Sequence, residues 1–137
     1  MKFASVAAAV LAFALTAVAQ TESVTYDTTY DNPSLSLASL ACSNNLIAKG
    51  YTTLSSLPNF PNAGGVYTVT SWDSPACGTC YEISYGDLTI PVLAVDVALD
   101  GFNLAEETMD TLTGGLAAEL GRVEVTAVAV DASYCGI

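Results

Sequence analysis

The 137-residue chain contains no histidine and only 3 lysine and arginine residues, against 14 aspartate and glutamate residues. Without histidine the protein lacks the most common general base and metal ligand, which excludes Ser-His and Cys-His nucleophile systems. The formal net charge is −11 at pH 7. Such a chain repels phosphate backbones and anionic lipid, so we expect no nucleic-acid partner, whereas a neutral polysaccharide is compatible with this charge.

Long apolar runs are confined to the N-terminus. Lys2 precedes a nearly continuous apolar run from Phe3 to Leu15, and the segment ends in the small residues of Ala17-Val18-Ala19. This order is typical of a secretory signal peptide, so 1–19 is predicted to be removed and 20–137 to form one secreted, extracellular domain. A retained membrane anchor is the alternative, but the run is short for a span of about 20 residues. No other segment is expected to cross a membrane.

The four cysteines, Cys42, Cys77, Cys80 and Cys135, are an even set. In an exported chain they are predicted to form two structural disulfides, although spacing alone leaves three connectivities open. The Cys77–Cys80 segment is a CxxC motif, but the βαβ context of a thioredoxin-like redox pair is missing. A zinc site would need all four thiolates, and the other two cysteines lie far apart in the sequence. We therefore expect neither a metal nor a cofactor.

Alternating residues predict strands. In Val24–Asp31, Tyr26 and Tyr30 share one face while Asp27 and Asp31 share the other, which predicts a half-exposed strand. Leu57–Gly65 contains two prolines and two glycines and is predicted to be a structured loop. Further strands are predicted at Val66–Trp72, Cys80–Tyr85, Leu88–Val97 and Arg122–Val130, with a hairpin turn at Gly86-Asp87.

Two or three short helices are predicted between these strands. One covers Asn44–Lys49 and is stopped by Gly50. A second is expected after Asn103, which has the form of an N-cap with Glu106 at the N3 position of a capping box. A third covers Leu116–Leu120. Five or six strands with short helices indicate a mainly β fold, either a β-barrel or a related architecture closed by disulfides.

Asp96 is the first candidate for a functional residue, because it ends an apolar strand in phase with Ile90, Val92 and Ala94. A carboxylate in this position must reach a groove at the rim or find hydrogen-bond donors inside. It could serve as a general acid, or it could accept backbone N–H groups and fix loop 97–103. Both interpretations remain open from the residues alone.

The other candidates have structural alternatives. Asn103 is explained by helix capping, and Asp27 by solvation on an exposed strand face. Tyr26 and Tyr30 fit either core packing or stacking against a sugar ring. Glycoside hydrolysis needs a second carboxylate roughly 5–10 Å from the acid, and the spacing identifies no partner for Asp96. We therefore predict that the protein is not an enzyme.

With these segments identified, the chain resembles the cerato-platanin family of small secreted fungal proteins. The matching stretches occur in the family's order and span nearly the whole domain. They are VTYDTTYD (24–31), SLPNFPNAGG (56–65), SWDSPACGTCYEISY (71–85), IPVLAVD (90–96), GFNL (101–104), MDTLTGG (109–115) and LGRVEV (120–125).

The resemblance implies a six-stranded double-psi β-barrel with the disulfides Cys42–Cys77 and Cys80–Cys135. It also implies a shallow groove that binds chitin-type N-acetylglucosamine oligomers. The residues that match positions in or beside this groove are Asp96, Asn103, Tyr26, Asp27 and Tyr30.

The function expected from this resemblance is a non-catalytic, secreted protein that binds chitin or related cell-wall oligosaccharides and loosens wall polysaccharide. Family members also elicit plant defences, which implies a plant receptor as a partner, and they self-assemble at interfaces. Two alternatives are kept: a weak glycoside hydrolase, and a surface-active coat protein without a glycan site.

Overall fold

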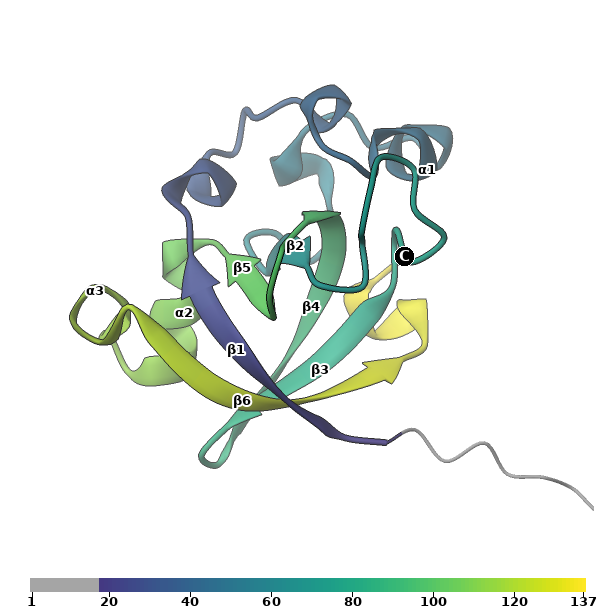
Figure 1. Ribbon diagram of the computed structural model, residues 1–137. Coiled ribbons are helices and arrows are strands. Elements are labelled where there is room, and N and C mark those ends of the chain that lie inside the picture. The colour runs from purple at the N-terminus through teal and green to yellow at the C-terminus, as the bar shows by residue number, and fades with distance from the viewer. Residues whose placement is uncertain (1–17) are drawn as a thin grey trace, which may run out of the picture.

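Six strands form a closed barrel in the order β1-β5-β2-β4-β3-β6, as Figure 1 shows. The structure is a computed structural model that describes residues 18–137, so nearly all of the predicted signal peptide lies outside the described residues. The pairs β1·β5 and β2·β4 are parallel and the other four are antiparallel. The predicted six-stranded, mainly β class is therefore confirmed. The strands are β1 (Gln20–Tyr26), β2 (Ala63–Val66), β3 (Cys80–Tyr85), β4 (Leu88–Val97), β5 (Phe102–Leu104) and β6 (Arg122–Val130).

Three short α-helices and several 3-10 turns surround the barrel (Figure 1). None of the helices within 18–137 has the length and apolarity needed to span a membrane. The α-helices are α1 (Ser43–Ala48), α2 (Glu106–Thr113) and α3 (Ala117–Leu120), and the 3-10 helices are η1 (Thr28–Asp31), η2 (Leu37–Ser39), η3 (Leu54–Ser56) and η4 (Ala132–Cys135).

The β3–β4 hairpin is confirmed, with Tyr85 opposite Leu88 and Gly86 in a left-handed conformation (φ 59°) at the turn. Pro91 is tolerated inside β4 because only β3 pairs with that part of the strand; pairing with β2 begins at Leu93. From Val92 to Val95 all four residues of β4 are buried, which agrees with their apolar character on both faces.

The barrel interior contains a row of apolar residues, one from each of five neighbouring strands. The register places Val97, Val66, Phe102, Val24 and Val123 side by side. Four of them are buried, and Val97 is half-buried. Burying such side chains contributes roughly 1.5–3 kcal/mol each, so this row is a major source of stability. Because side chains alternate across a strand, the neighbouring row must face outward.

The strand predicted over 24–31 is wrong in its second half. β1 starts earlier, at Gln20, and ends at Tyr26, and Thr28–Asp31 forms the 3-10 helix η1. The cause is local: the Asp27 carboxylate accepts a 2.8 Å hydrogen bond from the backbone N–H of Thr29. Short acidic side chains compete in this way with strand pairing and favour a turn.

The strand predicted at Val66–Trp72 is also wrong, because β2 lies in the predicted loop and ends at Val66. Its two glycines make this possible. A Cβ added to Gly64 would lie 2.3 Å from the carbonyl oxygen of Asn103, and one added to Gly65 would lie 2.6 Å from that of Val97. The strand is therefore formed by close backbone approach rather than by a side-chain pattern.

The capping box predicted at Asn103 is wrong. Asn103 lies inside β5, and α2 begins at Glu106 without a local side-chain cap. Instead, the carboxylate of Asp31 accepts the N–H groups of Glu106 and Glu107 at 2.8 and 3.0 Å. The helix buries Thr108, Met109 and Leu112.

Both disulfides implied by the family resemblance are present. Cys42–Cys77 closes a separation of 35 residues and Cys80–Cys135 one of 55 residues. In the chain-entropy model each contributes about 4 kcal/mol by restricting the unfolded chain. The first attaches α1 to the loop before β3, and the second attaches the C-terminal segment to β3, so the ends of the long loops are fixed to the barrel.

Candidate functional site

Five neighbouring strands each contribute one residue to a row that faces outward. Gly65 pairs with both Asp96 and Asn103, and Thr25 pairs with both Asn103 and Arg122. The row is one position along from the apolar row of the interior, so its side chains point away from the barrel interior. In order across β4, β2, β5, β1 and β6 it consists of Asp96, Gly65, Asn103, Thr25 and Arg122.

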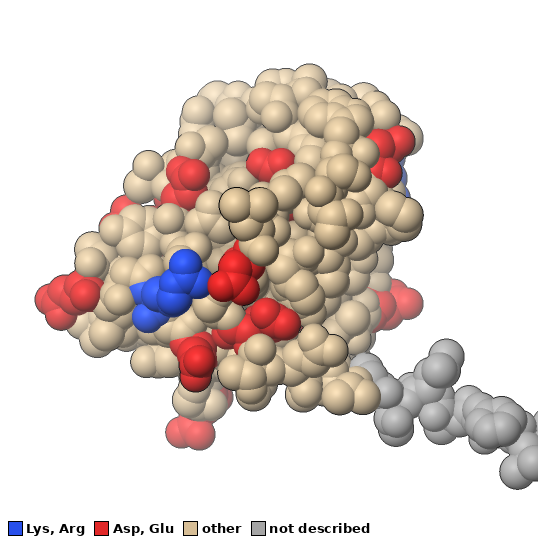
Figure 2. All heavy atoms as spheres, in the orientation of Figure 1, with Lys and Arg blue, Asp and Glu red and all other residues tan. Residues whose placement is uncertain are grey.

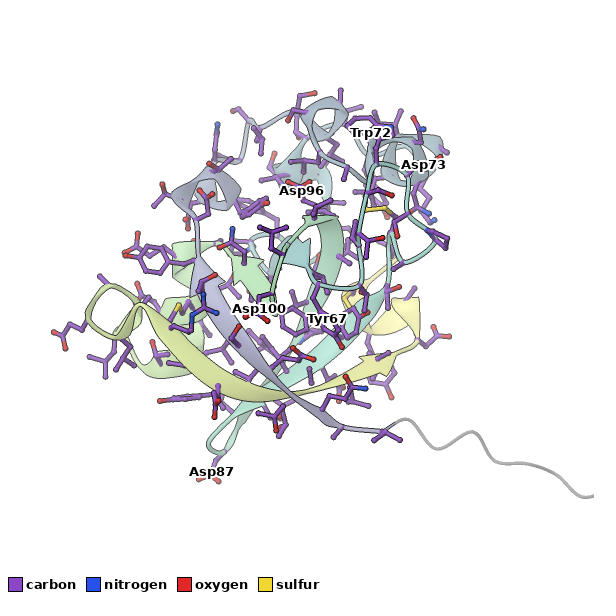
Figure 3. The ribbon with its side chains drawn as sticks, viewed as in Figure 1. Tyr67, Trp72, Asp73, Asp87, Asp96 and Asp100 are labelled. Atoms are coloured by element: carbon purple, nitrogen blue, oxygen red, sulfur yellow. A yellow bond between two sulfur atoms is a disulfide. The ribbon has the colours of Figure 1, made fainter. Side chains whose placement is uncertain are left out.

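The loop that follows β4 crosses this row at Gly65. A Cβ on Gly65 would meet the Val97 carbonyl oxygen at 2.6 Å and the Cβ of Ala98 at 3.3 Å, so the loop fills the space above the glycine. Asp96 therefore lies on one side of the loop and Asn103 on the other. Figure 3 shows Asp96, in β4, near the upper end of the barrel. Asp100, in the loop that follows β4, lies lower on the front of the barrel.

Asp96 is engaged by three hydrogen-bond donors. Its Oδ2 accepts from the hydroxyl of Tyr30 at 2.8 Å. Its Oδ1 accepts from the backbone N–H groups of Ala41 at 3.0 Å and Val97 at 2.9 Å. A carboxylate offers about four lone-pair positions, so about one is left for a ligand. The structure thus supports the interpretation that Asp96 fixes the start of the following loop.

Tyr30, which the sequence left open between core packing and stacking against a sugar ring, lies beside Asp96 in the structure. It is buried, at 5% exposure, with its ring in the core. Burial, followed by the negative charge of Asp96, raises the pKa of Tyr30 well above its usual range. The hydroxyl therefore keeps its proton and acts as a permanent donor to Asp96.

Tyr26 and Asp27 flank this cluster without a direct hydrogen bond to Asp96. Tyr26 ends β1 opposite Leu104 and packs, half-buried, against the core. Asp27 is exposed and caps η1 through the N–H of Thr29. Tyr26 thus fits the interpretation of core packing, whereas Asp27 caps a 3-10 turn and does not lie on an exposed strand face.

A shallow pocket of about 350 Å³ lies on the Asn103 side of the loop; it is called the Asn103 pocket below. The hydroxyl of Thr25 donates to Oδ1 of Asn103 at 3.0 Å, which leaves the amide N–H groups of Asn103 available as donors. The lining residues are Thr25, Val97, Ala98, Leu99, Asp100, Asn103 and Arg122.

The loop wall of the Asn103 pocket is attached at several points. Gly101 (φ 54°) lies so close to Ser23 that a Cβ there would meet its carbonyl oxygen at 2.2 Å, and the Gly101 carbonyl accepts from Tyr67 N–H at 2.8 Å. Arg122 donates to the Ser23 hydroxyl at 2.8 Å and lies 3.7 Å from the Asp100 carboxylate. Leu99 alone projects fully into solvent. The pocket is therefore largely preformed.

Chemically, the Asn103 pocket combines amide and guanidinium donors with hydroxyl and carboxylate acceptors, which suits a neutral ligand rich in hydroxyl groups. Within 18–137 no group of three or more His, Cys, Asp or Glu side chains could hold a metal ion. The sequence did not single out Thr25 or Arg122, because only the pairing of β1 with β5 and β6 brings them beside Asn103. The one signal in the sequence for Thr25 is its position on the same outward face of the predicted strand as Asp27.

Comparison with known proteins places this architecture among fungal proteins. The Cerato-platanin family model matches residues 22–137. The chain is 47% identical over 125 residues to the heat-stable 19 kDa antigen of Coccidioides immitis, covering 89% of this chain and 86% of that protein. It is 45% identical to allergen Asp f 15 of Aspergillus fumigatus, with 82% and 76% covered. Identity to cerato-platanin of Ceratocystis fimbriata f. sp. platani is 40%, with 87% and 90% covered.

Solved structures give the same result. Cerato-platanin 3 from M. perniciosa superposes with a TM-score of 0.82 at 43% identity, covering 86% of this chain and 100% of that one. The solution structure of the fungal elicitor Cerato-Platanin has a TM-score of 0.74 at 41% identity, with 82% and 95% covered.

Proposed function

The chain belongs to the cerato-platanin family, and we propose that it is a secreted, non-catalytic protein that binds chitin-type N-acetylglucosamine oligomers. Binding loosens contacts between wall polysaccharides, and plants perceive the protein as an elicitor. The observation that supports this proposal best is the Asn103 pocket, a preformed hollow of about 350 Å³. Both uncharged and charged side chains supply its hydrogen-bond donors and acceptors.

The ligand class follows from the lining of this pocket. The free amide N–H groups of Asn103 suit the carbonyl of an N-acetyl group or a ring hydroxyl, because both are acceptors. The exposed side chain of Leu99 offers an apolar surface to a methyl group or to the C–H face of a pyranose ring. The strongly acidic chain opposes polyanionic ligands. A neutral amino sugar polymer satisfies all three conditions.

The absence of catalysis is proposed from the state of Asp96. A general acid must carry a proton that it can give to the leaving group. The oxygens of Asp96 instead accept three hydrogen bonds, from Tyr30, Ala41 and Val97, so the group is arranged as an acceptor. Separating two glycan chains requires binding only, and no second carboxylate is needed.

Secretion and recognition by plants rest on other observations. The N-terminal segment has the form of a signal peptide. One similar solved structure is described as a fungal elicitor, and similar fungal proteins are described as an antigen and an allergen. These descriptions support a protein that leaves the fungal cell and meets a host, and in a plant host we propose a receptor as its partner.

The test is a two-dimensional NMR titration of the oxidised domain, residues 20–137, with chitin oligomers and, in parallel, with cellulose oligomers. We expect the amides of Thr25, Leu99, Asp100 and Asn103 to shift together, and more strongly with the chitin oligomers. Asn103→Ala is expected to weaken binding, whereas Asn44→Ala on the exposed face of α1 serves as the matched control. No shift at millimolar ligand would overturn the proposal.

Hydrolysis is tested in the same samples by following reducing ends over time. The proposal expects no sustained release. A release that persists in the wild-type protein and disappears in Asp96→Asn would establish the alternative, a weak glycoside hydrolase.

A surface-active coat protein is a second candidate, favoured by exposed apolar side chains. Leu116 caps the start of the short helix α3 and Leu120 is its last residue; they are 41% and 45% exposed. Side chains four residues apart lie on one face of a helix, so the two leucines form a small apolar surface suited to self-assembly at an interface. This candidate expects film formation that Asn103→Ala leaves unchanged and that Leu116→Ser with Leu120→Ser abolishes.

A further inference from the structure

The outer face of β1 and β6 is a continuous polar strip. Their register places three residue pairs opposite each other, and each pair faces away from the core because the intervening Val24, Val123 and Val125 are buried. Figure 2 shows this side of the molecule, where a blue patch lies among red ones. The pairs are Thr25 with Arg122, Ser23 with Glu124, and Thr21 with Thr126.

The Asn103 pocket occupies only one end of this strip, at Thr25 and Arg122. A second hollow of about 340 Å³ lies at the other end, beside the turn of the β3–β4 hairpin; it is called the Thr126 pocket here. Two hollows of nearly equal size thus share one polar surface. The lining residues of the Thr126 pocket are Thr21, Ser84, Tyr85, Gly86, Glu124, Val125 and Thr126.

Hydroxyl groups dominate the Thr126 pocket. The register aligns Thr21, Thr126, Ser84 and Thr89 in one row across β1, β6, β3 and β4. The hydroxyls of Ser84 and Thr89 bond to each other at 2.7 Å. Those of Thr21 and Thr126 make no hydrogen bond within residues 18–137, so they are free to donate and accept.

The remaining lining residues select a neutral ligand. The exposed carboxylate of Glu124 accepts hydrogen bonds and repels anions. The half-buried ring of Tyr85 adds an apolar surface of the kind on which a sugar ring packs. The Thr126 pocket therefore fits the same chemical class of ligand as the Asn103 pocket, a chain of uncharged sugar units.

The separation of the two pockets sets the length of that ligand. Thr21 and Thr25 lie four positions apart on β1, which corresponds to about 13 Å at a rise of about 3.3 Å per residue. Between them Ser23 and Glu124 keep the surface polar. We propose that the outer face of β1 and β6 is one binding track, and that the Thr126 pocket is a second glycan subsite filled only by longer oligomers. This inference rests on the proposed function, since it extends the glycan from the Asn103 pocket.

A track of this kind makes affinity depend on oligomer length. A short oligomer fills one pocket, whereas a longer one engages the second pocket without losing further translational freedom, so the two contacts reinforce each other. Losing the two free threonine hydroxyls is expected to weaken binding of long oligomers on the order of tenfold, the effect of about two ordinary hydrogen bonds.

The experiment measures the affinity of the oxidised 20–137 domain for N-acetylglucosamine oligomers of increasing length by calorimetry. The variant is Thr21→Val with Thr126→Val, which keeps the side-chain shape and the high strand propensity while removing both hydroxyls. Thr52→Val, an exposed threonine outside the barrel strands, is the control. We expect wild-type affinity to rise with length, the double variant to lose this rise, and the affinity for the shortest binding oligomer to stay unchanged.

The outcomes separate the two proposals. If affinity does not rise with length, or if the double variant binds long oligomers as tightly as wild type, the track is overturned while the Asn103 pocket stands. If no oligomer of any length binds, the proposed function fails and the track fails with it. Amide shifts at Thr21, Ser84 and Thr126 that appear only with long oligomers would support the track independently.

Discussion

The hydroxyl of Tyr30 donates a 2.8 Å hydrogen bond to Oδ2 of Asp96, across a sequence separation of 66 residues. The other carboxylate oxygen accepts from Ala41 and Val97, so Asp96 joins η1, the segment before α1 and the end of β4. One carboxylate thus holds together three segments at the upper end of the barrel. This arrangement makes Asp96 a structural centre before any question of ligand binding arises.

Replacing Tyr30 by Phe keeps the buried ring and removes only the hydroxyl. Hydrogen bonds to charged groups contribute about 1.5–3 kcal/mol, so Tyr30→Phe is expected to lower the free energy of unfolding by about 2 kcal/mol. Urea unfolding of the oxidised protein measures this change. Tyr67→Phe is the control, because that hydroxyl bonds an exposed side chain, Gln20, at 3.2 Å and should matter less. Equal effects of the two variants would contradict the assigned role of Tyr30.

The raised pKa of Tyr30 also predicts a pH dependence. The folded protein keeps the Tyr30 proton to a higher pH than the unfolded chain, which loses it near the ordinary value of 10.0. This contribution to stability is therefore complete below pH 10.0 and is lost as the pH rises above it. Unfolding free energies measured between about pH 8 and about pH 11 should fall more steeply for wild type than for Tyr30→Phe. Parallel curves would show that Tyr30 is not the group responsible.

Asp31 provides a third prediction, because its carboxylate accepts the first two N–H groups of α2 from a position 75 residues away from Glu106. Asp31→Ala leaves both donors without this partner and removes a negative charge from the helix N-terminus. The expected loss is about 1–2 kcal/mol of unfolding free energy. Asp27→Ala, which removes a cap from only one 3-10 turn, should cost less. Thermal unfolding of the two variants in parallel would test this order.

The sequence predicted those elements whose signals are local. The β3–β4 hairpin follows from two predicted strands around Gly86-Asp87, and the helices predicted at Asn44–Lys49 and Leu116–Leu120 are present as α1 and α3. The chemistry of four cysteines in an exported chain predicted two disulfides, and the family resemblance supplied their pairing. Each of these inferences depends on neighbouring residues or on a small number of possible pairings.

The features that the sequence missed are made by distant residues. β2 has no alternating pattern to recognise, because Gly64 and Gly65 are required by backbone contacts with β5 and β4. Asn103 has the local form of a helix cap, yet pairing with Thr25 and Gly65 places it in a strand, and Asp31 takes the capping role. The Asn103 pocket likewise depends on pairing between β1, β5 and β6. Only the tertiary structure assembles these contacts.

Gly65 is the position where this dependence can be tested. It separates Asp96 from Asn103 in the outward row, and loop 98–101 crosses directly above it. In Gly65→Ala the new methyl group would lie 2.6 Å from the Val97 carbonyl oxygen, so the backbone of the loop must move. Overpacking of this kind costs about 1–3 kcal/mol, and displacing the loop moves one wall of the Asn103 pocket.

The expected result is a loss of unfolding free energy of about 2 kcal/mol in Gly65→Ala, together with amide shifts at Ala98, Leu99 and Asp100 in the absence of ligand. Gly114→Ala is the matched control, because a Cβ there has no atom within 4 Å and only the positive φ of 69° opposes it. That variant should lose about 1 kcal/mol and leave the loop amides unshifted. Glycan affinity should fall in Gly65→Ala alone, because only there does the loop wall move. If the loop amides of Gly65→Ala kept their wild-type shifts, contact with Gly65 would not be what holds loop 98–101 in place.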